Sequence, residues 1–169
     1  PVENYRRSMR YELPVPPSPN LPTQHSVLLY PSLCLFEGTV VSLGRGTDFP
    51  FEVYGHPDMK GRTFSFTPLP RAGAKNPPLC GRLCYGVDLR GKADDTIIAE
   101  GLNLDYLIDA YRDLDMGEAF FTPFFEKLIG VDYVRRMIME GCGADEIGAC
   151  WHDDVEKFER QRRPYLLYE

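Results

Sequence analysis

The segment Phe36–Glu52 reads FEGTVVSLGRGTDFPFE, and its composition decides what kind of fold the first half of the chain can form. It places two glutamates, one arginine and three glycines within seventeen residues, a density of glycine that neither long strands nor long helices favour. Glycines on both sides of Arg45 allow the backbone to turn with positive φ. We therefore expect short strands joined by tight turns that hold Glu37, Arg45, Thr47 and Glu52 close together.

The length and composition of the chain indicate one compact domain. It has 169 residues, of which 43% are hydrophobic, and these include ten Phe, ten Tyr and one Trp, so a substantial core is expected. A net charge of −6 and a pI of about 5.1 argue against nucleic acid or an anionic membrane as the main partner. No apolar run approaches the ~20 residues that span a bilayer, so no membrane insertion is expected.

The cysteine and glycine patterns predict neither a metal site nor a cofactor. The five cysteines cannot all pair within the chain. Three residues separate Cys80 from Cys84, and no second cysteine pair lies nearby, which does not match the usual zinc spacings. The chain also lacks a phosphate-binding loop, a dinucleotide fingerprint and a Gly-x-Ser-x-Gly elbow.

The first half of the chain is rich in proline and glycine. The run PVPPSPNLP at 14–22 predicts an extended arm, because each proline restricts its own φ and the residue before it. Thr23 is a candidate N-cap for a helix that Pro31 would end. Short strands are expected at 38–43, 51–55, 63–67 and 82–89, the last with Leu83, Tyr85, Val87 and Leu89 alternating as one face.

The second half has helical periodicity. Helices are expected from Asn103, from Thr122 to Gly130 and from Asp132 to Gly141, each with a capping residue at its start. A last helix at about 145–162 would be followed by a strand at 165–168. Its apolar stripe, expected to be buried, consists of Ile147, Cys150, Trp151, Val155 and Phe158.

These patterns predict an α+β fold with an irregular, Pro/Gly-rich mixed sheet in the first half and three to four helices in the second. Residues 1–22 would form an extended arm and residues 23–169 a single α+β domain.

The histidines and the tryptophan suggest ordinary structural roles. His25, His56 and His152 share no ligand-like spacing, and His152 is expected to be solvated. His56 fits a turn. Trp151 could stack on a sugar, but its position on an apolar helical stripe favours packing in the core.

The residues around Gly44–Gly46 are the candidate binding site. Arg45 can present its guanidinium fork to a carboxylate from Glu37, from Glu52 or from a substrate. A purely structural reading is also open, in which a buried Arg–Glu pair, with Glu52 the stronger candidate, pins an irregular loop. Neutral groups that suit sugar hydroxyls and amides come from Ser18, Asn20, Thr39 and Thr47.

Five motifs in a fixed order carry a family resemblance. They are PPSPNLPT (16–23), YPSLCLFEGT (30–39), S-x-GRGT (42–47), PFE (50–52) and RRPYLLY (162–168). With them, the chain resembles the C-terminal portion of the NamZ-type exo-β-N-acetylmuramidases, bacterial cell-wall glycosidases that were long a domain of unknown function. The resemblance runs from about Tyr5 to Tyr168.

The resemblance implies that the chain is part of a longer two-domain enzyme. A Rossmann-like N-terminal domain would carry the proposed catalytic glutamate, and the active site would lie in the cleft between the domains. The substrates would be peptidoglycan fragments, from which the enzyme releases terminal N-acetylmuramic acid without a cofactor. The protein would be periplasmic or secreted, and this part alone would be inactive.

Matching the motifs residue by residue gives the expected lining of that cleft. Glu37 would be a second catalytic carboxyl, since glycosidases commonly use two, and Arg45 could engage the lactyl carboxylate of muramic acid. Leu43 and Tyr5 depart from the family pattern, which has a small polar or acidic residue and a tryptophan there. The substrate-binding residues would be Ser18, Asn20, Thr39, Arg45, Thr47 and Glu52.

Two other functions fit the same residues. The chain could be a non-catalytic module that binds cell-wall glycans through the same polar loops, or a structural domain that stabilises a neighbour. A Rossmann-like region directly upstream would favour the enzyme, whereas an unrelated catalytic domain there would favour the module.

Overall fold

The computed structural model describes Arg6 and residues 9–167, and it confirms the α+β fold. Tyr5 and Tyr168, which bound the resemblance, lie outside the described residues. Along the described chain the elements are α1 (Gln24–Leu33), η2 (Cys34–Gly38), β1 (Val53–His56), β2 (Phe64–Phe66), β3 (Cys84–Asp88), α2 (Asp94–Glu100), α3 (Asp105–Leu114), η3 (Gly117–Phe120), α4 (Phe125–Ile129), α5 (Tyr133–Met139), α6 (Ala144–Ala149), α7 (His152–Arg162) and η4 (Arg163–Tyr165), where η marks a 3-10 helix.

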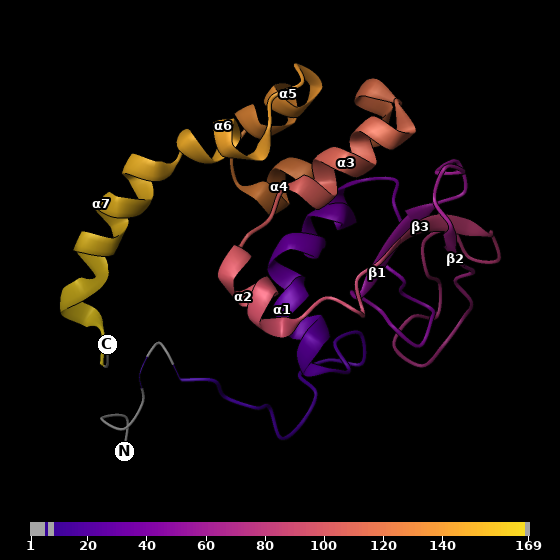
Figure 1. Cartoon of the computed structure of the whole chain (residues 1–169), viewed down its shortest axis with the longest axis horizontal. Helices are drawn as coiled ribbons and strands as arrows, with labels where there is room; N and C mark the ends of the chain where they lie inside the picture. The colour runs from indigo at the N-terminus through magenta and orange to yellow at the C-terminus, as the bar shows by residue number, and fades with distance from the viewer. Residues whose placement is uncertain (1–5, 7–8, 168–169) are drawn as a thin grey trace.

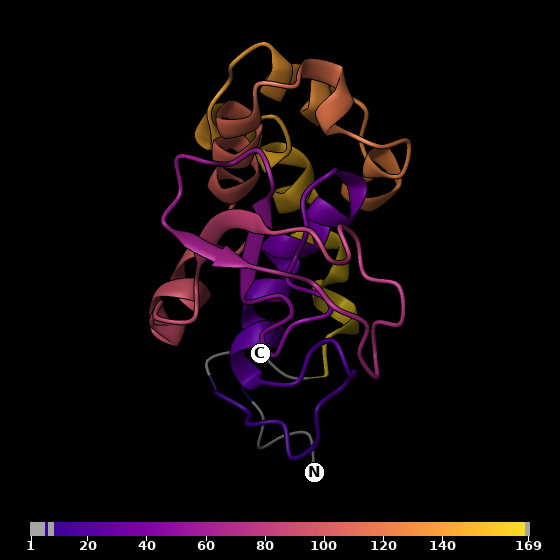
Figure 2. The ribbon, with the colours of Figure 1, turned by 90° about the vertical axis from the view of Figure 1, so that its right-hand side faces the viewer.

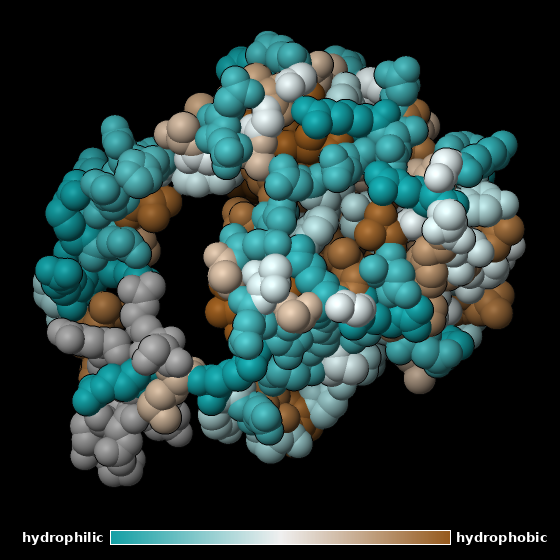
Figure 3. All heavy atoms as spheres, viewed as in Figure 1, coloured by the Kyte–Doolittle hydropathy of each residue, from teal (hydrophilic) through white to brown (hydrophobic). Residues whose placement is uncertain are grey.

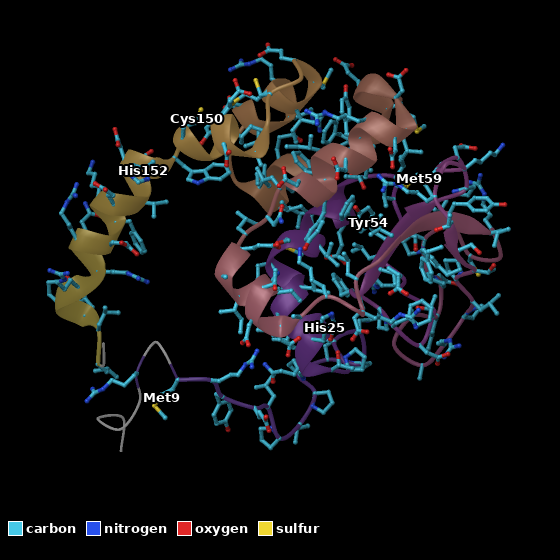
Figure 4. The ribbon with its side chains drawn as sticks, in the orientation of Figure 1. Met9, His25, Tyr54, Met59, Cys150 and His152 are labelled. Carbon is cyan, nitrogen blue, oxygen red and sulfur yellow. The ribbon has the colours of Figure 1, made fainter. Side chains whose placement is uncertain are left out.

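Helix α1 lies at the centre of the fold (Figure 1). It contacts η2, α2 and α3, with the sheet to one side and α3 to α6 gathered beyond its C-terminal end (Figures 1 and 2). One large apolar core joins these layers, and Tyr54 and Met59, labelled in Figure 4, belong to it. Other fully buried members are Leu29, Phe36, Phe120, Phe125 and Ile147.

The sheet has the order β1–β3–β2, and both pairings are antiparallel. The expected mixed sheet is therefore antiparallel throughout the described residues. The strand expected at 38–43 is not formed, because its ends pair with different partners. Thr39 bridges to Phe121, whereas Ser42 exchanges both backbone hydrogen bonds with Gly55.

The sequence pattern predicted that β3 is buried on one face only. Both faces are covered, so this prediction was wrong in part. Leu83 is exposed, while Cys84, assigned to the other face, is fully buried in a small cluster with Val53 and Phe66. Burial raises the pKa of the Cys84 thiol to about 11. On the opposite face Tyr85 and Val87 pack against the main core.

Helix α1 begins as expected and ends later than expected. The Thr23 hydroxyl accepts a hydrogen bond from the Ser26 amide at 2.9 Å, which confirms Thr23 as the N-cap. The helix continues through Pro31 to Leu33 and runs on into η2. Proline is tolerated here because it removes a single amide, close to the end of the helix, where the backbone tightens into 3-10 geometry.

The second half contains more helices than expected, six from Asp94 to Arg162. Asn103 accepts a hydrogen bond from the Asp105 amide at 2.8 Å, but the N-cap of α3 is Leu104, so the predicted capping residue lies one position too early. Gly130 has left-handed backbone geometry at the end of α4, as predicted. That helix begins at Phe125 rather than at Pro123.

The long helix expected at 145–162 is two helices, α6 and α7, with a break at Cys150 and Trp151. At the break the Cys150 and Trp151 amides bond to carbonyls three residues back, so the regular i to i−4 pattern is interrupted. From this point α7 leaves the body of the domain (Figure 1). After η4, no strand forms among residues 165–167.

The break leaves only part of the predicted stripe buried. Ile147 is fully buried and Trp151 packs partly on the core, as expected for both. Cys150 is exposed, against the expectation of a buried thiol, and all five cysteines are free. Val155 and Phe158 are exposed because α7 carries them away from the core.

The sheet depends on Gly86, which lies opposite Gly55 in the register of β1 and β3. A Cβ atom at Gly86 would overlap the Tyr54 carbonyl and lie 2.6 Å from Gly55 Cα. We expect Gly86→Ala to lower the free energy of unfolding by about 3 kcal/mol, because the backbones must separate. Urea denaturation measures this loss. In the control Gly91→Ala, the added methyl has no neighbour within 4 Å, and an equal loss there would contradict the steric argument.

Candidate functional site

The Arg45 side chain pairs with Glu37. Arg45 Nη1 donates a hydrogen bond to Glu37 Oε1 at 3.0 Å, and the two side chains are 34% and 28% exposed. Glu37 belongs to η2, while Arg45 occupies the turn between two glycines with positive φ. The predicted approach of Arg45 to an acid of the same segment is confirmed, and of the two candidates Glu37, not Glu52, is its partner.

Close packing holds the turn that carries Arg45. A Cβ atom at Gly44 would lie 2.6 Å from the Val53 side chain, and one at Gly46 would lie 2.6 Å from the Leu69 carbonyl. The Thr47 hydroxyl closes the turn by donating to the Gly44 carbonyl at 2.6 Å. The turn therefore requires glycine at positions 44 and 46 for two reasons. The φ angles there are positive, and a side chain would collide with neighbouring atoms.

Arg45 and Glu37 border a hollow of about 210 Å³, which also contains Phe36, Thr39, Pro78 and Phe124. Arg45 Nε is buried and has no hydrogen-bond partner among the described residues. The Thr39 hydroxyl donates to the Phe36 carbonyl at 2.9 Å and accepts from the Val41 amide at 3.1 Å, so it shapes the wall. The hollow is thus bordered by a carboxylate and by the guanidinium that pairs with it, between apolar walls.

A second hollow of about 450 Å³ lies on the other side of the turn. Thr47 and Asn20 line it, together with an ion pair between Arg71 and Asp48. Asn20 Nδ2 donates to the Gly73 carbonyl at 2.9 Å, which joins the arm to the 71–74 loop. Four of the predicted binding residues are therefore divided between two hollows, Thr39 and Arg45 at the first and Asn20 and Thr47 at the second.

Neither Ser18 nor Glu52 lines either of the two hollows. The Ser18 hydroxyl accepts from the Asn20 amide at 3.2 Å and holds a turn of the arm. Glu52 is buried and accepts a hydrogen bond from the Thr23 hydroxyl, which ties the segment before β1 to the start of α1. Both residues support the loops that carry the hollows.

His25 joins two distant parts of the chain near Glu52. Its Nδ1 lies 2.6 Å from Asp94 Oδ1, and its Nε2 lies 3.0 Å from the Leu89 carbonyl. Burial lowers the pKa of His25, but the hydrogen bonds to Asp94 and Leu89 and the negative charges of Asp94 and Glu52 raise this pKa above its ordinary value overall. The imidazolium form can donate to both acceptors at once.

Sequence reasoning missed several residues of the two hollows. Asp48 lies inside the motif segment, so its polar character was a signal that could have been used. Pro78, Arg71 and Phe124 reach the hollows only through tertiary packing. Across the described part of the chain, no three His, Cys, Asp or Glu side chains group as metal ligands, and none of the described helices is long and apolar enough to cross a bilayer.

Residues 28–168 match the family model described as "Exo-beta-N-acetylmuramidase NamZ, C-terminal". The chain belongs to this family. It is also 34% identical, over 184 aligned residues, to the "Peptidoglycan beta-N-acetylmuramidase NamZ" of Bacillus subtilis (strain 168). That alignment covers 99% of this chain and 44% of the Bacillus protein.

Two solved structures share the fold, both described as DUF1343 family proteins from Bacteroides fragilis NCTC 9343. One is 59% identical with a TM-score of 0.97 and covers 99% of this chain and 47% of its own. The second is 15% identical with a TM-score of 0.72, covers 98% of this chain and 49% of its own, and shows the fold alone. The chain therefore spans about half the length of the relatives that it matches.

The His25 contacts predict a pH-dependent stability. A folded-state pKa above the ordinary value of 6.5 means that the stabilisation is complete below that value and is lost as the pH rises through the folded-state pKa. We expect Asp94→Asn to weaken this dependence, because the partner of the imidazolium loses its charge. Urea denaturation from about pH 5 to 9 measures it. The solvent-exposed His152 is the control, and a wild-type slope that survives in Asp94→Asn but disappears in His152→Asn would contradict the assignment.

Proposed function

We propose that this chain is the C-terminal part of a glycoside hydrolase that releases terminal N-acetylmuramic acid from peptidoglycan fragments. The proposal extends to this chain the activity printed for its Bacillus relative. The active site would be a cleft between residues 23–169 and a Rossmann-like N-terminal domain, joined through the arm at 1–22. Because its substrate lies outside the cytoplasmic membrane, the enzyme would be periplasmic or secreted.

The observation that carries the proposal is the Arg45–Glu37 pair at the first hollow. Both side chains are about one-third exposed, so a substrate can reach them. Arg45 Nε is buried, so a ligand would bind through the exposed part of the guanidinium. This geometry suits recognition of an anionic group beside a carboxylic acid.

Glu37 would supply one of the two carboxyl groups of glycoside hydrolysis. The other would come from the N-terminal domain, on the opposite side of the cleft. Since the stereochemical outcome depends on the separation of the two groups, the position of Glu37 relative to that domain would decide it. In this arrangement the present chain contributes chemistry but is inactive by itself.

Arg45 would recognise the lactyl carboxylate that distinguishes muramic acid from glucosamine. A planar guanidinium can bind a carboxylate through two parallel hydrogen bonds, which gives direction as well as charge. Asn20 and Thr47 in the second hollow would hold hydroxyl and amide groups of the rest of the substrate.

The role of Glu37 is tested in the complete two-domain protein. We expect Glu37→Gln to lower kcat on a muramic-acid-terminated disaccharide by about 10²- to 10⁴-fold, the range for loss of an acid–base group. Asp113→Asn is the matched control, because Asp113 and Arg62 form a similar pair that is 33% and 35% exposed and lines neither hollow. Unchanged turnover in Glu37→Gln would remove this residue from catalysis and favour a binding module.

The role of Arg45 is tested by substrate preference. We expect Arg45→Ala to lower kcat/KM for the muramic-acid substrate by about 10- to 100-fold, through loss of charge-assisted hydrogen bonds. The value for the matching glucosamine substrate should change little, because it lacks the carboxylate. Arg62→Ala serves as the control. An unaltered preference for muramic acid in Arg45→Ala would contradict the proposed specificity role.

A further inference from the structure

Beyond Trp151, which packs partly on the core, helix α7 has an apolar face that the described residues leave exposed. None of its residues is buried, and Val155 and Phe158 are 49% and 60% exposed. With Trp151 they are spaced i, i+4 and i+7, which places them on one side of the helix axis. Charged residues occupy the opposite side, where Arg160 pairs with Glu156. An amphipathic helix of this kind is stable when its apolar face is covered.

The N-terminal arm carries a second set of apolar side chains that the described part of the chain leaves exposed. Met9, Tyr11, Leu13 and Val15 alternate with other residues and are all exposed. Arg10 lies 3.2 Å from Asp95 at the start of α2, so the arm is anchored through its polar side. The arm is thus tied to α2 through Arg10, while Met9 and Tyr11 stay exposed, at 54% and 58%.

The two apolar surfaces lie at the same end of the molecule. Met9 and the C-terminal end of α7 are on one side of the domain in Figure 4. Figure 3 shows an open space between α7 and the rest of the domain, with apolar atoms on the edge of α7 that borders it. A single partner placed there would contact the helix and the arm together.

We propose that the N-terminal half of the same polypeptide fills this space and packs against the Val155–Phe158 face of α7 and the apolar side of the arm. The inference rests on the two-domain organisation proposed above. Its support is the length of the relatives, of which this chain covers 44% and 47%, and the description of the matching family as C-terminal. In that organisation the arm would lead to the N-terminal half.

A covalent connection favours this occupant over a second copy of the chain. A domain joined through a short arm has an effective concentration beside α7 in the millimolar range, on the order of that for short linkers. A second copy at ordinary protein concentrations cannot match this. Helix α7 and the arm would then hold the N-terminal domain from two sides. In this way they would set the width of the cleft that contains Arg45 and Glu37.

Photo-cross-linking in the full-length protein tests the proposal. Phe158 is replaced with p-benzoylphenylalanine, a change that an exposed aromatic position tolerates, and the products are identified by mass spectrometry after irradiation. We expect cross-links within one chain, from position 158 to peptides of the N-terminal half. The same probe at Arg160, on the charged side of α7, should give a yield several-fold lower. Cross-links to a second copy, or a yield at 158 no higher than at 160, would overturn the proposal.

An activity assay on the same samples separates this inference from the proposed function. Muramic acid release without the expected cross-links refutes the α7 interface and leaves the enzymatic proposal standing. Cross-links from 158 to the N-terminal half in a protein that releases no muramic acid support the interface and refute the enzymatic proposal.

Discussion

The candidate site depends on backbone segments packed too closely for any side chain. Arg45 lies in a turn whose Gly46 would place a Cβ atom 2.6 Å from the Leu69 carbonyl. Its partner Glu37 precedes Gly38, where a Cβ atom would lie 2.5 Å from Phe125 Cα. Each end of the ion pair is therefore held by a glycine contact with a different part of the fold, the first with the 69–77 loop and the second with α4. The distance between Arg45 and Glu37 is set by the tertiary structure and not by the flexibility of two long side chains.

The small contribution of the Arg45–Glu37 ion pair to stability indicates what the fixed position of its two residues is for. Ion pairs with about one-third of each side chain exposed contribute roughly 0–1 kcal/mol to stability, so the pair adds little to the folding of the domain. Binding depends more strongly on fixed geometry, because a guanidinium held in place loses less entropy when it meets a carboxylate. A pair that stabilises little but is held rigidly fits a recognition role better than a structural one.

The same domain has a well-packed centre and an incomplete periphery. Helix α1, the sheet and α3 to α6 share one core, whereas α7 and the arm expose apolar residues at one end of the molecule. The chain spans about half the length of its relatives, and both the hollows and the exposed helix become parts of interfaces if the other half packs there. One domain arrangement would then cover both the hollow beside Arg45 and the exposed face of α7.

The sequence by itself determined the features that depend on neighbouring residues. The α+β class, the Thr23 cap and the positive φ angles of the glycines on both sides of Arg45 follow from steric and hydrogen-bonding rules that act over a few residues. The motifs in their order identified the family.

Only the tertiary structure decided the features that join distant positions. Glu52 accepts a hydrogen bond from Thr23 instead of pairing with Arg45, and His25 contacts Asp94, 69 residues further along the chain. These pairs form because packing of α1 against the sheet and α2 brings them together. The apolar stripe from Ile147 onward looked continuous, yet the backbone breaks at Cys150 and carries Val155 away from the core. Periodicity tells which side chains share a helix face, but whether that face is covered depends on what lies opposite it in space.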